Sequence, residues 1–294
     1  MPKYLVSHKS CHDGLASAWV AKRFDSSLNV FFSSRKHEWK KVLNLQAGDF
    51  VYFTDFAPNP EDMFGLINRG IDCRVLDHHD TDVNKIKEFD LKNNGELSKH
   101  CTFDMSKAGC LVAWDYFFKD EPYPKMLEYI SIADVWQWRD EKDHFVIQYL
   151  RTLLDQDAGL DEFKKILSEF DEEKFAMLGS GIYRRVEKDS KYMAARFCIM
   201  DFDGTQVAAV NATLYYSEVG HELTLVSPTG LGVVYSMIPE SNTMKVSVRG
   251  SGANKFAEKY GGGGHPQAAG FYMTLEQFNK YLATAKRSAI MEVS

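Results

Sequence analysis

A chain of 294 residues with a net charge of −6 and 45% hydrophobic residues is large enough for one large domain or two ordinary ones, each with a packed core. This apolar content excludes a disordered chain, and the negative charge argues against a protein that coats long duplex nucleic acid. No apolar stretch approaches the length that spans a bilayer, and the five cysteines lack the paired spacing of a disulfide scaffold. We therefore expect a cytoplasmic protein that does not bind membranes. The sequence indicates no oligomeric state.

The first half of the chain alternates between strand and helix patterns. Strands are expected at 3–8, 28–32, 50–54 and 71–76, and helices at 14–22 and 60–68. Further helices are expected within 159–190 and within 106–134, a stretch that ends in a hydrophobic run and Asp134. This alternation predicts an α/β fold, in which a mostly parallel sheet carries helices on both faces.

The pattern changes beyond about residue 195. Strand candidates follow at short intervals at 206–211, 222–227, 232–238 and 244–248, and helices are expected at 254–260 and 275–290. Two domains are therefore expected, residues 1–185 and 199–294, joined by a linker at 186–198. The second is expected to be a smaller α+β domain with a mixed or antiparallel sheet.

Histidines and aspartates follow three of the predicted strands directly. The first strand ends at His8, shortly before Asp13, and the strand at 50–54 leads into Asp55. The strand at 71–76 leads into the run Asp77-His78-His79. In open α/β sheets the chemistry gathers where parallel strands end, so these side chains are expected at one edge of one sheet.

Together with Asp134, these carboxylates and imidazoles form a set that suits divalent metal ions. The candidate ligands are His8, Asp13, Asp55, His78, His79 and Asp134. Such a set favours Mn²⁺, Mg²⁺ or another hard-to-borderline ion. Two ions about 3.5–4 Å apart can share one carboxylate, and Asp55 on the central strand is the expected bridge. The alternative is that each residue caps a helix or lies in a surface loop, but the coincidence of three strand ends favours the metal site.

A run of four glycines at 261–264 precedes a histidine in the second half of the chain. Glycines allow backbone N–H groups to turn inward as an anion-binding nest, and neighbouring basic side chains would add hydrogen bonds to phosphate oxygens. The candidate phosphate contacts are Arg249, Gly262, Gly263, Gly264 and His265. The alternative is a flexible linker, although the run lacks serine and lies inside a domain.

This ordered set of motifs resembles the DHH phosphoesterase superfamily, which includes RecJ-type exonucleases, nanoRNases, cyclic-nucleotide and cyclic-dinucleotide phosphodiesterases and family II pyrophosphatases. Residues 8–14 (HKSCHDG) resemble its first motif, Thr54-Asp55 the second, Asp77-His78-His79 the third and Ala133-Asp134 the fourth. The segment 261–271 resembles the signature of the DHH-associated C-terminal domain. The resemblance covers nearly the whole chain.

The resemblance implies two divalent metal ions. The first would be held by His8 and Asp55, and the second by Asp13, Asp55, His78 and Asp134. One position departs from the family's pattern, because Cys11 stands where the first motif usually supplies an acid. Two interpretations stay open: a thiolate that shifts the preference towards zinc or iron, or a first ion that binds weakly. The neighbouring His12 is a further candidate ligand.

The resemblance also implies the catalytic and substrate contacts. Asp77 would orient the ring of His78, and His79 would face the substrate phosphate. Arg249, the glycines at 262–264 and His265 would bind the phosphate or the terminal nucleotide. Residues 1–185 would thus be the metal-binding catalytic domain and residues 199–294 the substrate-binding domain.

These features lead to one expected activity and two alternatives. The expected activity is a metal-dependent phosphodiesterase that hydrolyses short single-stranded oligonucleotides or small nucleotides, cyclic ones included, through attack of metal-bound hydroxide on phosphorus. The two ions are expected to be Mn²⁺, with Mg²⁺, Co²⁺ and Zn²⁺ as alternatives. The alternative functions are a phosphomonoesterase or pyrophosphatase, and a non-catalytic nucleotide sensor that has lost its first metal ion through Cys11.

Overall fold

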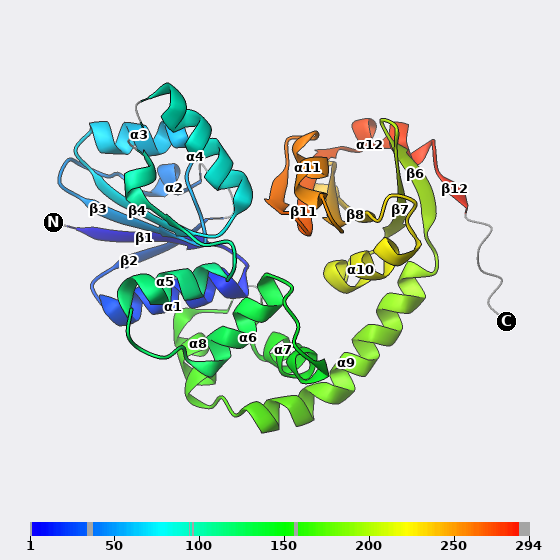
Figure 1. Ribbon diagram of the computed structural model, residues 1–294, viewed down its shortest axis with the longest axis horizontal. Helices are drawn as coiled ribbons and strands as arrows, with labels where there is room; N and C mark the ends of the chain where they lie inside the picture. Colours follow the sequence, from blue (N-terminus) through cyan, green and yellow to red (C-terminus); the bar gives the residue numbers. More distant parts are fainter. Residues whose placement is uncertain (1, 34–37, 94, 96, 156–157, 288–294) are drawn as a thin grey trace. The chain divides into compact units, whose positions relative to one another are not determined.

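The computed structural model describes residues 2–33, 38–93, 95, 97–155 and 158–287 (Figure 1). The chain divides into two compact units, Met1–Ile182 and Tyr183–Ser294, and each contains one sheet. The division falls within the long helix α9 (Glu172–Ala194), so the segment 186–198, expected to be a linker, is helical as far as Ala194. Among the described residues, no helix combines the length and the apolar character needed to span a bilayer.

The sheet of the first unit is built from strands that all run parallel. Their order across the sheet is β2-β1-β3-β4-β5. The strands are β1 (Lys3–His8), β2 (Asn29–Ser33), β3 (Phe50–Thr54), β4 (Asp72–Asp77) and β5 (Cys101–Phe103). The predicted α/β class with a parallel sheet is confirmed. The sequence pattern missed β5, which is too short to show an alternation.

Helices cover both faces of this sheet, with α1 and α5 on one face and α2, α3 and α4 on the other (Figure 1). The helices are α1 (His12–Phe24), α2 (Trp39–Val42), α3 (Pro60–Asn68), α4 (Asp80–Lys92), α5 (Gly109–Phe117), α6 (Lys125–Asp134), α7 (Glu141–Leu153) and α8 (Leu160–Ser168), with a 3₁₀ turn η1 (Leu97–His100). Because both faces are covered, the strands are apolar on both sides. Phe53 and Val75 pack with Met63 of α3, whereas Leu76 packs with Leu15 of α1.

A further layer of helices packs on the outside of α1 and α5. Leu15 and Val112 from these two helices share a core with Ile130 of α6, Val146 of α7 and Phe163 of α8. This packing anchors α6, whose last residue is Asp134. The helix that carries the fourth acid is therefore fixed by its apolar face.

The second unit contains a mixed sheet. Its strand order is β10-β11-β9-β8-β7-β6-β12, and only the β7–β8 pair among the described strands is parallel. The strands are β6 (Cys198–Phe202), β7 (Thr205–Asn211), β8 (Gly232–Ile238), β9 (Thr243–Arg249), β10 (Gly263–His265), β11 (Ala268–Thr274) and β12 (Lys286–Arg287). The prediction of a smaller α+β unit with a mixed sheet is confirmed.

Helices lie on both faces of the mixed sheet. They are α10 (Tyr216–Val226), α11 (Ala253–Glu258) and α12 (Leu275–Leu282), with a 3₁₀ turn η2 (Pro239–Ser241). Val219 and Leu223 of α10 pack on Val234, and Phe256 of α11 and Phe278 of α12 pack in the core of the opposite face.

Two secondary-structure predictions in this unit need correction. The strand expected at 222–227 is wrong, because residues 222–226 belong to α10. The apolar residues at its end resemble a short strand, but the four-residue spacing of Val219 and Leu223 gives the segment a helical buried face. The helix expected at 275–290 ends at Leu282, and Lys286–Arg287 form β12. The rest of that prediction, from residue 288 onwards, lies outside the described residues.

Candidate metal centre

The carboxyl ends of three neighbouring strands lie level with one another. Ser7 of β1 pairs with Thr54 of β3, which in turn pairs with Leu76 of β4. The residues that follow them are His8, Asp55 and Asp77. Asp55 has a φ of 49°, a left-handed backbone conformation that aspartate tolerates better than most residues. The parallel register therefore brings the three predicted strand exits to one edge of the sheet.

The ring of His78 lies at the centre of three carboxylates. Its Nε2 atom is 3.2 Å from Asp55 Oδ1, 3.4 Å from Asp134 Oδ2 and 3.5 Å from Asp13 Oδ2. The His78 side chain is 1% exposed, and those of Asp13 and Asp55 are no more than 2% exposed. Four residues from α1, α6 and the segments after β3 and β4 thus meet at one point, as the sequence pattern led us to expect.

Asp13 is held in this cluster by the amino-terminal end of α5. Its Oδ2 accepts the N–H of Gly109 (2.7 Å) and its Oδ1 that of Cys110 (2.8 Å). The N-cap residue Ala108 has no side chain that could do this, so Asp13 caps α5 from another helix. A Cβ at position 109 would lie 2.8 Å from Asp55 Cβ, so only glycine fits there. Sequence reasoning missed Gly109, and its signal was a helix start without a capping residue of its own.

His8 and Cys11 lie on the other side of Asp55. His8 Nδ1 is 3.6 Å from Asp55 Oδ2, and one donor atom from each of His8, Cys11 and Asp55 lies within 4.8 Å of the other two. Asp55 therefore directs one oxygen towards His78 and the other towards His8. His12, the further candidate ligand of the first ion, makes a different contact: its Nε2 is 2.9 Å from the carbonyl oxygen of Leu154.

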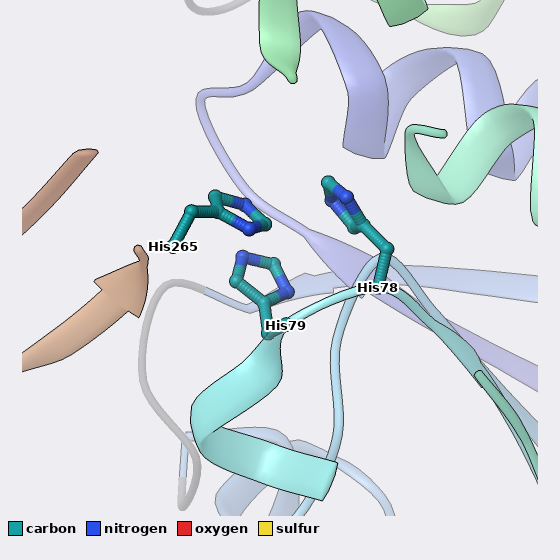
Figure 2. A group of neighbouring side chains, drawn as sticks. All are labelled: His78, His79 and His265. Carbon is teal, nitrogen blue, oxygen red and sulfur yellow. The ribbon is translucent and has the colours of Figure 1, made fainter. Parts of the chain in front are cut away.

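Asp77 supports His79 rather than the ring of His78. Its Oδ1 accepts from Nδ1 of His79 (2.7 Å), and it reaches His78 through the backbone N–H (2.8 Å). Figure 2 shows the two imidazoles, which project from the segment between β4 and α4 with ring centroids 4.8 Å apart. The expectation that Asp77 orients the His78 ring is therefore wrong in this structure. The choice depends on the backbone angles of consecutive residues, which a sequence motif does not reveal.

Buried charges shift the proton affinities of the two histidines. Burial alone would lower the pKa of His78, but the hydrogen bond to Asp55 and the charges of Asp134 and Asp13 outweigh it and raise the pKa to about 10. Burial likewise opposes protonation of His79, and the charge and hydrogen bond of Asp77 raise its pKa to about 9. Burial and the charges of Asp55 and Asp134 together raise the pKa of Asp13. The carboxylates of this cluster thus repel one another, and the raised pKa of Asp13 is one result.

These donor atoms fit divalent cations. Three carboxylates packed around one imidazole leave an excess of buried negative charge, which a cation would offset. The Oδ2 atom of Asp55 is buried and accepts no hydrogen bond from any residue that the structure describes. Burial, with the charges of Asp55 and Asp134, also raises the pKa of the Cys11 thiol well above its usual range, so only a nearby cation would favour its thiolate.

The candidate phosphate contacts of the second unit lie on one edge of its sheet. Arg249 pairs with Ala268, which in turn pairs with His265, so Arg249 and His265 project from the same face two strands apart. Arg249 Nη2 donates to Ser217 Oγ of α10 (2.8 Å). The aliphatic part of the arginine packs against Gly220 of the same helix, where an added Cβ would lie 2.6 Å from Arg249 Cγ. This contact fixes the arginine on the sheet.

The glycine run forms part of a hairpin rather than an open loop. Gly263–His265 is the strand β10, which pairs with β11. A Cβ at Gly262 would lie 2.2 Å from the carbonyl oxygen of Gly270, and one at Gly264 would lie 2.6 Å from that of Ala268. The turn is joined to the loop after β9 because Gly252 N–H donates to Pro266 O (2.9 Å). Close strand contact explains these two glycines without a bound anion.

Comparisons with known proteins agree with the fold and the motifs. The model of the DHHA1 domain matches residues 226–290. Uncharacterized protein R106 of Acanthamoeba polyphaga mimivirus is 25% identical over 75% of this chain and 52% of its own length. Oligoribonuclease NrnB of Bacillus subtilis (strain 168) is 24% identical over 97% of this chain and 76% of its own length. The chain thus spans about half the length of the first of these curated relatives.

The chain is also similar to solved structures. The DHH domain of a member of a family of ribosomal proteins has a TM-score of 0.50 at 13% identity, and the match covers 96% of this chain and 85% of that domain. RecJ of Thermus thermophilus, solved in complex with Mn²⁺, has a TM-score of 0.46 at 15% identity over 96% of this chain and 51% of its own. The match to the DHHA1 domain and the similarity to NrnB support a member of the DHH superfamily with a DHHA1 domain in its C-terminal part.

Proposed function

We propose that this protein is a metal-dependent phosphodiesterase that hydrolyses short single-stranded oligonucleotides or small nucleotides. The observation that supports this most is the position of Asp55, whose two oxygens face two separate groups of donor atoms. A carboxylate in that position can bridge two divalent ions. The relative NrnB is named an oligoribonuclease, and the match to it covers 97% of this chain and 76% of NrnB. That name supports the substrate class, and we propose Mn²⁺ as the preferred ion.

The metal ligands in this proposal are the residues of the two groups. His8 and Asp55 would hold one ion, and Asp13, Asp55, His78 and Asp134 would hold the other. Bound ions would supply an activated water and neutralise the charge that builds on the phosphoryl group. The protein fixes the ligands beforehand, because α5 holds Asp13 and the turn at Asp55 holds the shared carboxylate.

His79 is the proposed catalytic residue. Burial opposes protonation of His79, but Asp77 accepts from its Nδ1 and raises its pKa to about 9, so a protonated imidazole would donate to a phosphate or leaving-group oxygen. Its side chain is 23% exposed, more than the 1% of His78. Exposure and charge both suit His79 for contact with substrate rather than for a purely structural role.

The two units have separate roles in this proposal. Residues 1–185 form the catalytic domain, and residues 199–294 bind the substrate. Arg249 and His265, on the same face of the mixed sheet, contact the phosphate or the terminal nucleotide, and Gly262, Gly263 and Gly264 shape the hairpin that carries His265. The spacing of two strands, about 10 Å, suits a ligand larger than a single phosphate.

Hydrolysis assays with matched variants test the catalytic proposal. With di- to pentanucleotides and Mn²⁺, Asp55→Asn and His78→Ala are expected to lower kcat by more than about 100-fold. Loss of a residue that only supports a metal ligand lowers activity by up to about 100-fold, so loss of a ligand itself should exceed that value. Asp143→Asn is the control, because Asp143 is equally buried but pairs with Arg139 at 2.6 Å outside the cluster. Circular dichroism checks that all three variants fold. Full activity in Asp55→Asn would overturn the assignment, and release of free phosphate alone would identify a phosphomonoesterase.

Steady-state kinetics tests the role of the second unit. Arg249→Ala and His265→Ala are expected to raise KM by about tenfold or more, with a smaller change in kcat, because they remove binding contacts rather than metal ligands. Arg185→Ala is the matched control, since Arg185 is exposed on α9 and pairs with Asp189. Unchanged KM in both variants would contradict a substrate contact at this edge.

A further inference from the structure

Cys11 lies directly over the carboxyl end of β1. Ser10 has a φ of 55°, which turns the chain back after the strand, and Cys11 is the N-cap residue of α1. The first turn of α1 is packed tightly on the strand end, because a Cβ at Gly14 would lie 2.2 Å from the carbonyl oxygen of His8. This local fold places the thiol on the same side of the centre as His8.

The donor atoms around Cys11 lie close enough together to belong to one candidate metal site. Donor atoms with bonds of about 2.0 and 2.3 Å to a tetrahedral ion stand about 3.5 Å apart. His8 Nδ1 and Asp55 Oδ2 are 3.6 Å apart, and a donor atom of Cys11 lies within 4.8 Å of a donor atom of each of these residues.

A second observation is independent of the cysteine. The Asp55 side chain is 2% exposed, and its Oδ2, on the side of His8, accepts no hydrogen bond within the described part of the chain. A buried carboxylate oxygen without a donor is costly unless a cation meets it. The opposite oxygen, Oδ1, is 3.2 Å from His78 Nε2, so the two oxygens of Asp55 differ in this respect.

The two halves also differ in their donor chemistry. Asp13, Asp55 and Asp134 surround a single imidazole in one half, an oxygen-rich set that suits Mn²⁺ or Mg²⁺. The other half combines a thiol, an imidazole and one carboxylate oxygen, and a thiolate with an imidazole favours softer ions. A hollow of about 100 Å³, lined by His8, Cys11 and Phe32 among others, gives access to this half.

We propose that Cys11, as a thiolate, is a ligand of the first metal ion, and that the half-site of His8, Cys11 and Asp55 takes Zn²⁺, Co²⁺ or Fe²⁺ in preference to Mn²⁺ or Mg²⁺. The proposal rests on the proposed function in so far as it concerns the same centre. Under this proposal the two ions differ: the half-site of Cys11 binds a softer ion through sulfur, and the other half-site binds its ion through oxygen and nitrogen atoms alone. The thiol proton is released to solvent as the metal–sulfur bond forms, so no oxidant or reductant is needed.

Optical spectroscopy with Co²⁺ tests the ligand without relying on activity. Full-length protein is freed of metal with a chelator, kept reduced and titrated with Co²⁺. The wild type is expected to show a thiolate-to-cobalt charge-transfer band in the near ultraviolet, and Cys11→Ser is expected to lose it. Cys101→Ser and Cys198→Ser are matched controls, since both cysteines are also partly exposed but lie elsewhere. A wild type without the band, or a Cys11→Ser variant that keeps it, overturns the proposal.

Metal affinities provide the second measurement. Cys11→Asp restores an oxygen donor, and it is expected to weaken Zn²⁺ binding at this half-site by about tenfold or more while it strengthens Mn²⁺ binding. Equal shifts for both ions would contradict a thiolate ligand. The outcomes separate the two proposals: a protein that shows the band but hydrolyses no nucleotide overturns only the proposed function. One that hydrolyses oligonucleotides without the band overturns only the role of Cys11.

Discussion

The metal centre of the first unit and the hairpin edge of the second both place polar side chains at the ends of strands, but at very different spacings. Parallel strands put all their carboxyl ends at one edge, and the donor atoms around His78 lie 3.2–3.5 Å from its Nε2. In the mixed sheet, antiparallel pairing leaves Arg249 and His265 on one face but two strands, roughly 10 Å, apart. The first arrangement can hold an ion, whereas the side chains of the second stand too far apart to hold one between them.

Glycines serve the two regions in different ways. Gly109 lets the start of α5 approach Asp55 and Asp13, so it acts directly on two of the proposed metal ligands. Gly262 and Gly264 let β10 approach β11, so they act on the shape of a hairpin. Substitutions at these positions should therefore separate metal binding from substrate binding.

The largest effect is expected from Gly109→Ala. The new Cβ would lie 2.8 Å from Asp55 Cβ and 3.0 Å from Asp13 Oδ2, so α5 and the shared carboxylate must move apart. A displacement of about 1 Å at a catalytic group costs about 100-fold in rate, and more is expected here because two ligands move. Hydrolysis kinetics and Mn²⁺ binding measure the loss. Gly65→Ala in α3 is the control, since nothing lies within 4 Å of a Cβ added there. Equal activity in both variants would contradict a special role of Gly109 at the metal centre.

Metal removal should affect only one region. Mn²⁺ at about 100 times its Kd should stabilise the unit that binds it by about 2.7 kcal/mol. Hydrogen exchange of the full chain is the measurement, with slower exchange expected in β3, β4 and α5 after Mn²⁺ is added. Exchange in β8, β9 and β11 should stay unchanged. Asp55→Asn should abolish the effect, and equal protection of both units would contradict a metal centre confined to the first.

Sequence reasoning could find the candidate metal centre because most of its residues follow strands of a parallel sheet. Once the strands ending at His8, Thr54 and Leu76 were identified, the common edge followed from topology alone. Asp134 was found as an acid at the end of a hydrophobic helical run rather than at the end of a strand, and the family motif includes it as well. The positions of residues at the ends of strands and helices can thus be predicted without knowledge of any side-chain angle.

Contacts that depend on tertiary packing could not be found in this way. The N–H groups of Gly109 and Cys110 reach Asp13 because the start of α5 lies against α1, which no local pattern encodes. The partner of Asp77 depends on backbone angles over three consecutive residues. The glycine run was interpreted as an anion-binding nest because the sequence does not show how closely β10 and β11 approach.

Asp77→Asn tests whether this revised pairing matters. Loss of the Asp77 charge should lower the pKa of His79 from about 9, so the protonated form would be lost at lower pH. Hydrolysis at a mildly alkaline pH is expected to fall about 10- to 100-fold, and the alkaline limb of the pH–rate profile should shift to lower pH. In the wild type, the raised pKa of His79 stabilises the fold below pH 6.5, and this contribution fades as the pH rises through about 9.

The control for this variant is Asp80→Asn, one residue beyond His79 and in the first turn of α4. It keeps the hydrogen bond between Asp77 and His79, so its pH–rate profile should match that of the wild type. A profile that shifts equally in both variants would indicate a general effect of charge. It would then contradict a specific role of the Asp77–His79 pair.

The smallest effect is expected from Thr274→Ala, which removes the N-cap of α12 on the face of the mixed sheet opposite to Arg249 and His265. Thr274 and Gln277 form a capping box at the start of α12, in which Thr274 Oγ1 accepts the Gln277 N–H (3.2 Å) and Gln277 Oε1 accepts the Thr274 N–H (2.9 Å). Its loss should lower the free energy of unfolding of the second unit by about 1 kcal/mol. Because α12 packs on the face away from Arg249 and His265, KM and kcat should stay unchanged. Urea unfolding and steady-state kinetics measure both, and a raised KM would mean that the contact face depends on α12 more than its packing suggests.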